Sequence, residues 1–176
     1  MRNRENIIIA GGTSSGKTTL LNAVIDCIAQ PHPDHRLVLM EQVGELQCRA
    51  ANHVPMLTTD AVSLQRLLKV LMRLRPDRPI VGEVRGGEAL ELLKAWNTGH
   101  NGGASTLHAN SAADALIRFE QCIQEVSWSP MQRLIGAAVD LIVFIQKTKE
   151  PPGRKVTEVV RVHGFSDGEY QLSTLE

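Results

Sequence analysis

Residues 11–18 read Gly-Gly-Thr-Ser-Ser-Gly-Lys-Thr and fit the pattern G-x-x-x-x-G-K-[ST], which constrains the fold more than any other stretch of the chain. The apolar run at residues 6–10 predicts a buried strand before it. Residues 19–25 predict a helix after it, because their apolar positions recur every three or four residues. A strand, a glycine-rich loop and a helix in this order predict a phosphate-binding loop in an α/β domain.

The residue types of this loop suit the binding of a nucleotide such as ATP. Successive backbone N–H groups at a helix N-terminus form a nest for phosphate oxygens, and the helix dipole favours negative charge there. We expect Lys17 to reach the β- and γ-phosphates from an exposed loop and the Thr18 hydroxyl to hold Mg²⁺. A glycine-rich turn that binds nothing is the alternative, and the complete strand-loop-helix context disfavours it. The expected nucleotide contacts are Gly11, Gly12, Thr13, Ser14, Ser15, Gly16, Lys17, Thr18 and Thr19.

The composition of the 176-residue chain predicts a single domain, residues 1–176, with an aliphatic core, since 43% of the residues are hydrophobic and only 3% are aromatic. The formal net charge is zero, so the chain lacks the basic excess of a nucleic-acid binder, and we expect no direct nucleic-acid partner. The longest apolar stretch, residues 134–145, contains Asp140 and is too short to span a membrane. The three scattered cysteines predict small buried apolar residues in a reducing cytosol rather than disulfides or a zinc site.

Several acidic and imidazole side chains are predicted at strand ends. Glu83 follows the apolar run 79–82 at the position of a Walker B acid, where a carboxylate can polarise the attacking water, although Gly82 replaces the usual aspartate. Glu41 follows the strand predicted at 37–40. His108 ends the strand predicted at 104–108, so it should point to the same edge as Glu83. Histidines in such positions are more often structural than functional, but a phosphate-binding loop beside them shifts that balance.

The remaining pattern alternates strands with helices, which predicts a mainly parallel α/β sheet ending in an antiparallel hairpin at the turn Asp167-Gly168. Residues 48–56 predict a short edge strand because Pro55 cannot lie in a central one. Asp60 is expected to cap a helix that ends at Pro76, and Ser111 a helix that reaches residue 126. Further helices are expected at 88–97 and from Ser129 to about residue 139, and strands at 141–145, 156–162 and 170–175.

Four segments, in order along nearly the whole chain, resemble motifs of the traffic ATPases of type II secretion, type IV secretion and type IV pili. Residues 11–18 are similar to their Walker A, 39–46 to their Asp box, 73–86 to their Walker B segment and 98–110 to their His box. The amino-acid sequence of residues 82–89 and 106–111 is most similar to that of the conjugal-transfer members of the type IV secretion branch. The resemblance corresponds to the C-terminal, RecA-like ATPase domain of the family, and we expect the family's N-terminal domain to be absent.

The resemblance implies a ring-shaped homo-hexamer that hydrolyses ATP with Mg²⁺ on the cytoplasmic side of a bacterial inner membrane, where it works with the inner-membrane subunits of a secretion system. It also implies site residues: Glu83 as the catalytic acid, Glu41 as a catalytic and Mg²⁺-handling carboxylate, His108 as the γ-phosphate sensor, His100 as its weaker companion, and Arg85 and Arg75 as charge relays or contacts to a neighbour's nucleotide. Because the predicted first strand begins almost at residue 1, we expect base recognition to be weak or supplied by a neighbour.

Two departures from the family pattern bear on the reading. Gln42 replaces a second acid of the Asp box, and the tetracysteine zinc site of the type II branch is missing. A type IV pilus or type II secretion ATPase stays open as an alternative. A P-loop kinase would need a lid insertion that the sequence does not show, a RecA-type nucleic-acid motor would need a basic surface or stacking aromatics, and Glu83 disfavours a non-catalytic nucleotide switch.

Overall fold

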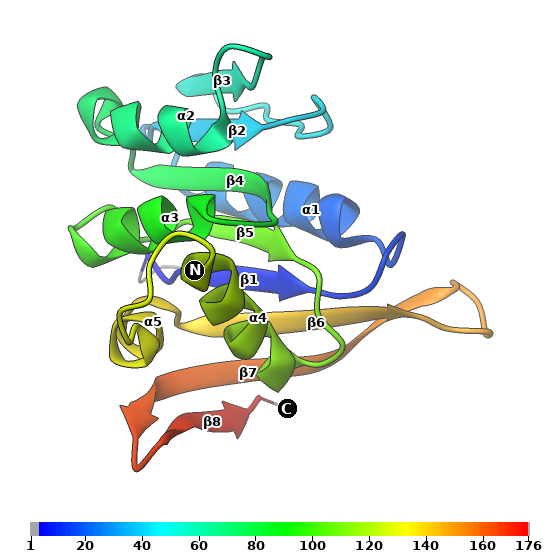
Figure 1. The fold of residues 1–176 in the computed structure, drawn as a ribbon. Helices are drawn as coiled ribbons and strands as arrows, with labels where there is room; N and C mark the ends of the chain where they lie inside the picture. Colours follow the sequence, from blue (N-terminus) through cyan, green and yellow to red (C-terminus); the bar gives the residue numbers. More distant parts are fainter. Residues whose placement is uncertain (1–3, 176) are drawn as a thin grey trace.

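The computed structural model describes residues 4–175, which form one eight-stranded sheet with helices on both faces (Figure 1). The strand order is β3-β2-β4-β5-β1-β6-β7-β8. The strands are β1 (Ile7–Ala10), β2 (Leu37–Glu41), β3 (His53–Leu57), β4 (Arg78–Val84), β5 (Ala104–Leu107), β6 (Leu141–Lys147), β7 (Arg154–Ser166) and β8 (Glu169–Thr174). The helices are α1 (Lys17–Ala29), α2 (Leu64–Leu71), α3 (Glu88–Asn97), α4 (Ala112–Gln124) and α5 (Gln132–Ala138), with a 3-10 turn, Met72–Leu74, after α2.

The pairing of the strands confirms the predicted mainly parallel sheet. Strands β3, β2, β4, β5, β1 and β6 pair in parallel, and β7 and β8 extend the sheet as antiparallel strands. The turn at Asp167 and Gly168 has positive φ at both residues, as a tight hairpin turn requires. Pro55 lies on the edge strand β3, where it costs no hydrogen bond to a second neighbour.

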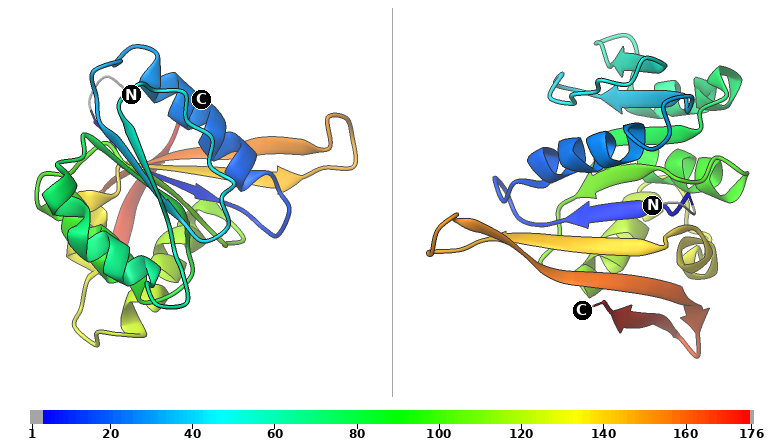
Figure 2. Two further views of the ribbon diagram at one scale, coloured as in Figure 1. Left: turned by 90° about the horizontal axis from the view of Figure 1, so that it is seen from above. Right: turned by 180° about the vertical axis from the view of Figure 1, so that it is seen from behind.

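The two faces of the sheet are covered unequally (Figure 2). Helix α1 packs Leu21, Ile25 and Ile28 on one face, against apolar side chains of β1, β2 and β4. Helices α2, α3, α4 and α5 cover the other face and build the larger core cluster. The core is mostly aliphatic, as predicted, with Trp96 and Phe119 stacked at its centre at 6.3 Å between ring centroids.

Two predicted helix starts are wrong. Helix α2 begins at Leu64, because the Ser63 hydroxyl accepts the Arg66 N–H, whereas Asp60 lies in a turn closed by an isolated bridge between Thr59 and Val62. Helix α5 begins at Gln132 rather than after Ser129. The residues before it, from 125 to 131, connect α4 to α5 without helical structure.

The cysteines have three different environments, and none of them forms a disulfide in the described residues. Cys122 is fully buried in the core, where desolvation raises the pKa of its thiol to about 11. Cys27 is exposed, so the prediction that all three are buried apolar residues is wrong for this one. Within residues 4–175, no helix combines the length and the apolar character needed to cross a membrane.

Candidate nucleotide-binding site

The predicted site residues lie mainly at the carboxyl-terminal edge of the parallel strands. The loop of residues 11–16 joins β1 to α1, Glu83 lies near the end of β4, and His108 directly follows β5. Glu41 ends β2 at the same edge. The register of β1, β5 and β4 brings these ends together, as parallel strands require.

The loop of residues 11–16 has the backbone geometry of a phosphate cradle. Gly16 precedes α1 with a φ of 99°, and a Cβ on Gly11 would lie 2.2 Å from the Ile145 carbonyl oxygen, so both positions require glycine. In the described structure, the N-terminus of α1 has neither a side-chain cap nor an acidic residue in its first turn. Its backbone N–H groups are therefore available to an anion.

Lys17 is the first residue of α1 and is buried, with 7% of its surface exposed, which corrects the expectation that it lies on an exposed loop. Its Nζ donates to the Gly12 carbonyl oxygen at 2.9 Å and lies 3.5 Å from both ring nitrogens of His108. Burial lowers the pKa of Lys17, and the Glu83 carboxylate opposes that shift. The ammonium group is thus held over the cradle at the place where a phosphate would meet it.

Glu83 is the centre of a charged cluster above the cradle. Its Oε1 lies 2.8 Å from His108 Nε2, and its Oε2 accepts from the Arg85 guanidinium. Burial and the nearby Lys17 ammonium lower the pKa of His108, so the imidazole is neutral at pH 7 and its Nε2–H donates to the carboxylate. The structure therefore brings Lys17, Glu83, Arg85 and His108 together.

A cavity of about 430 Å³ opens over the cradle. The side chains that line it come from α1, the cradle and four other segments: Thr13, Ser14, Ser15, Gly16, Lys17, Thr18, Thr19, Glu45, Glu83, Arg85, Thr106, His108 and Arg154. An open, polar cavity with an anion nest at its base suits a phosphorylated ligand.

A smaller cavity of about 90 Å³ adjoins the cradle and is lined in part by Thr18, Glu41 and Glu83. Hydroxyl and carboxylate oxygens are the donors that Mg²⁺ prefers, and this ion usually completes its shell with water and phosphate oxygens. The described residues contain no group of three or more acidic, histidine or cysteine side chains that could hold a metal alone. The side chains present therefore fit an Mg²⁺ ion bound jointly with phosphates.

Glu41 also has a structural role that the sequence did not indicate. Its carboxylate accepts the backbone N–H of Glu45 at 2.6 Å and that of Leu46 at 3.0 Å. These bonds close the loop after β2 beside the smaller cavity. Any contact of Glu41 to an ion would therefore be made by a carboxylate that already accepts two backbone N–H groups.

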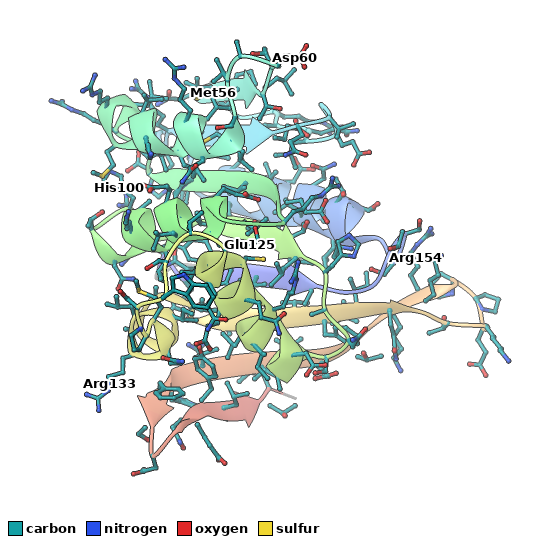
Figure 3. All side chains as sticks on the ribbon, in the orientation of Figure 1. Met56, Asp60, His100, Glu125, Arg133 and Arg154 are labelled. Carbon is teal, nitrogen blue, oxygen red and sulfur yellow. The ribbon has the colours of Figure 1, made fainter. Side chains whose placement is uncertain are left out.

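His100 and Arg75 do not lie at the cavity of this chain, which corrects the prediction that His100 accompanies His108, whereas the alternative that Arg75 contacts a neighbour's nucleotide stays a prediction. His100 follows α3 and precedes β5, and Figure 3 shows it at the opposite edge of the sheet from Arg154. Arg75 is exposed and directly precedes the segment that starts β4 at the same opposite edge. The reason is topological: a helix that follows a parallel strand runs back to the amino edge, so residues at its end lie there.

Three residues of the site region were missed or undervalued from the sequence. Thr106 lies on β5, and its hydroxyl donates to the Gly82 carbonyl oxygen at 2.7 Å, beside the irregular pairing of β4 with β5. Glu45, on the loop after β2, lines both cavities. Arg154 lies on β7, and no spacing in the sequence connects it to the cradle.

The fold and the site together define a P-loop nucleotide-binding domain of the RecA-like class, with the strand of His108 between the strand of the cradle and that of Glu83. The chain belongs to the family described as "Type II/IV secretion system protein", whose profile matches residues 1–158. It is 54% identical over 171 residues to a probable conjugal transfer protein TrbB of Sinorhizobium fredii, covering 97% of this chain and 52% of that protein. A conjugal transfer protein TrbB of Rhizobium radiobacter is 55% identical, with 96% and 51% covered.

A solved structure extends this comparison. The VirB11 ATPase of the Brucella suis type IV secretion system, solved in complex with sulphate, superimposes with a TM-score of 0.82 at 31% identity, covering 90% of this chain and 48% of that one. The chain spans about half the length of the curated relatives it matches. The predicted family and fold class are thereby confirmed.

Proposed function

We propose that this chain is the ATP-hydrolysing motor domain of a conjugation or type IV secretion system, where it powers substrate transfer or pilus assembly. The observation that carries the proposal is the convergence of Lys17, Glu83 and His108 over an uncapped helix N-terminus. The identity of more than half of the aligned positions with TrbB proteins favours the conjugal-transfer branch over the pilus and type II secretion branches.

The chemistry follows from what each side chain can do at the γ-phosphate. Lys17 neutralises the charge that develops on the phosphates, and Glu83 orients and polarises the attacking water. An Mg²⁺ ion held at Thr18, with Glu41 nearby, would supply further charge neutralisation on the phosphate oxygens. Both partners of Glu83, the neutral His108 and Arg85, line the phosphate cavity, so a γ-phosphate gives them a second anion to bind.

The proposal extends to assembly and location by family resemblance. A homo-hexameric ring would place a neighbouring subunit over the cavity, where Arg85 of this chain is partly exposed and Arg75 is available to a neighbour's site. The ring would lie on the cytoplasmic side of a bacterial inner membrane, bound to inner-membrane subunits of the secretion system.

The test is steady-state ATP hydrolysis measured against protein concentration, with the mass in solution measured by light scattering. Activity per subunit should rise as the chain assembles, and Glu83→Gln should lower turnover by at least about 100-fold while ATP binding is kept. Glu169→Gln, on the exposed end of β8, is the matched control and should leave turnover unchanged. Concentration-independent activity in a monomer would contradict the ring, and transfer of phosphate to a metabolite instead of water would identify a kinase.

A further inference from the structure

Strand β1 divides the groups around the cradle into two sets. On one side, β5 and β4 bring His108 and Glu83. On the other side, β6 pairs with β1, and the hairpin between β6 and β7 brings Arg154 to the cradle. Figure 3 shows Arg154 at the carboxyl-terminal edge beside the loop between β1 and α1.

Arg154 is fitted to the outside of the cradle by two contacts. Its Nε donates to the Ser14 carbonyl oxygen at 3.3 Å, and its Cδ lies where a Cβ on Gly16 would approach within 2.8 Å. The aliphatic part of the side chain therefore packs on Gly16, and a Cβ at this position would displace it.

The hairpin that carries Arg154 is closed by its own hydrogen bonds. The Thr148 N–H donates to the Gly153 carbonyl oxygen at 3.0 Å, and the Gly153 N–H donates to the Glu150 carbonyl oxygen at 2.8 Å. Arg154 pairs directly with Lys147 in the register of β6 and β7. The backbone position of Arg154 is thus set by the strand pairing of β6 and β7, not by a free loop.

The two sets of residues predict how a bound nucleotide is oriented in the cradle. Lys17, His108 and Glu83 mark the end for the γ-phosphate, and the remaining phosphates lie across the N-terminus of α1. The nucleoside then leaves the cradle on the side of β6 and β7. The residues that line the cavity include no tyrosine, tryptophan or phenylalanine to hold a base.

The guanidinium of Arg154 has the planar shape and the free hydrogen-bond donors needed to contact a ribose and a base. Among the described residues its one hydrogen bond is the one from Nε, so its two terminal nitrogens are available. A planar guanidinium can stack on a base and donate to ribose hydroxyls. His108 and Arg85, the other lining groups with a planar cation or ring, are held by Glu83 at the opposite end.

We propose that Arg154 binds the nucleoside half, the ribose and base, of a nucleotide whose phosphates occupy the cradle. The proposal rests on the proposed nucleotide-binding function and differs from the expectation that base recognition is weak or supplied by a neighbour. Arg154 is a positioning residue for the reaction, because it lies on the far side of the cradle from Glu83.

The test is calorimetric titration of wild type, Arg154→Ala and Lys155→Ala with MgATP, MgADP and magnesium tripolyphosphate, which lacks the nucleoside. Arg154→Ala should bind ATP and ADP about ten-fold more weakly and tripolyphosphate as tightly as wild type. Its KM for ATP should rise with kcat unchanged. Lys155, the exposed next residue of β7, is the matched control and should change none of these values.

Equal weakening toward all three ligands would overturn the proposal, since Arg154 would then act on the phosphates or only on the shape of the cradle. Unchanged affinity for all three in Arg154→Ala would overturn it as well. A wild-type chain that binds neither ATP nor tripolyphosphate would instead remove the cradle assignment, and the proposed function with it.

Discussion

The two edges of the parallel sheet both carry charged and polar side chains, but they use them in opposite ways. At the carboxyl edge, Lys17, Glu83 and His108 hold one another beside an open cavity. At the amino edge, the buried Asn6 and Arg78 bond backbone groups and neighbours within the fold. Polar and charged side chains thus line the candidate binding site at one edge and connect parts of the fold at the other.

The side chain of Asn6 connects the loop before β5 to the end of α5 at the amino edge through its hydrogen bonds. Its side-chain oxygen accepts the N–H groups of Gly102 and Gly103, and its amide donates to the Ala138 carbonyl oxygen at 2.7 Å. Each bond is to backbone, so no ligand can replace it without unfolding the segment. At the carboxyl edge, Glu83, His108 and Arg85 contact one another through their side chains, and a phosphate could replace these contacts without breaking a backbone hydrogen bond. The kind of partner, more than the residue type, therefore distinguishes a candidate binding residue from a structural one.

The largest expected effect is at the carboxyl edge. Lys17→Ala should weaken MgATP binding by about 100-fold or more, because two or three charge-assisted hydrogen bonds to phosphates are lost. The loss of the bond to the Gly12 carbonyl oxygen should lower the free energy of unfolding by only about 1 kcal/mol. Calorimetry and urea titration measure both values, and Lys94→Ala, on α3, is the control. Unchanged ATP affinity in Lys17→Ala would contradict the assignment of the carboxyl edge as the nucleotide-binding site.

At the amino edge the effect should fall on stability instead. Asn6→Ala leaves two N–H groups and one carbonyl oxygen without their partner, which should lower the free energy of unfolding by about 3 kcal/mol. ATP affinity of the folded variant should stay within about two-fold of wild type. Asn97→Ala, which removes one partly buried bond to the Leu93 carbonyl oxygen and one exposed bond to that of Leu134, should cost only about 1 kcal/mol. A loss of ATP binding in folded Asn6→Ala would contradict the assignment of a purely structural role to the amino edge.

A smaller effect should appear on the pH dependence. The pKa of His108 lies below its ordinary 6.5 in the folded chain, so the unfolded chain takes up this proton more readily as the pH falls. The free energy of unfolding of wild type should therefore decrease relative to His108→Asn when the pH is lowered from about 7.5 to about 5. Urea titrations at several pH values measure the difference, and a constant difference would show that His108 titrates as in the unfolded chain.

The rate of ATP hydrolysis is a second test of the role of His108. His108→Asn should hydrolyse ATP about ten-fold more slowly with near-normal ATP binding, since it contacts Glu83 and Lys17 but is not itself the general base. Normal turnover in this variant would make His108 a structural residue of the carboxyl edge.

The smallest effect is expected at His100. His100→Ala should leave turnover within about two-fold of wild type, because the residue lies at the edge opposite the cavity. Steady-state hydrolysis at saturating ATP is the measurement. A decrease similar to that of His108→Asn would mean that the two edges communicate.

The cradle, the mainly parallel sheet and the convergence of Glu83 with His108 could all be predicted from the sequence alone. These features depend on local spacing and on one rule, that parallel strands end at the same edge. The same rule places His100, in the segment between α3 and β5, at the amino edge of the sheet. The prediction that His100 lies near His108 came from the resemblance to the His box and did not apply this rule. A contiguous motif can therefore contain residues that lie far apart.

Which distant side chains line the site could be learned from the three-dimensional fold but not from the sequence. Arg154 meets Ser14 across 140 positions of sequence, because the order of strands places β6 beside β1 and the hairpin to β7 reaches beyond the edge. The burial of Lys17 likewise depends on His108 and Glu83 folding over it from other strands. Local pattern fixes what each segment forms, whereas strand order and packing, which depend on the whole chain, fix what each side chain meets.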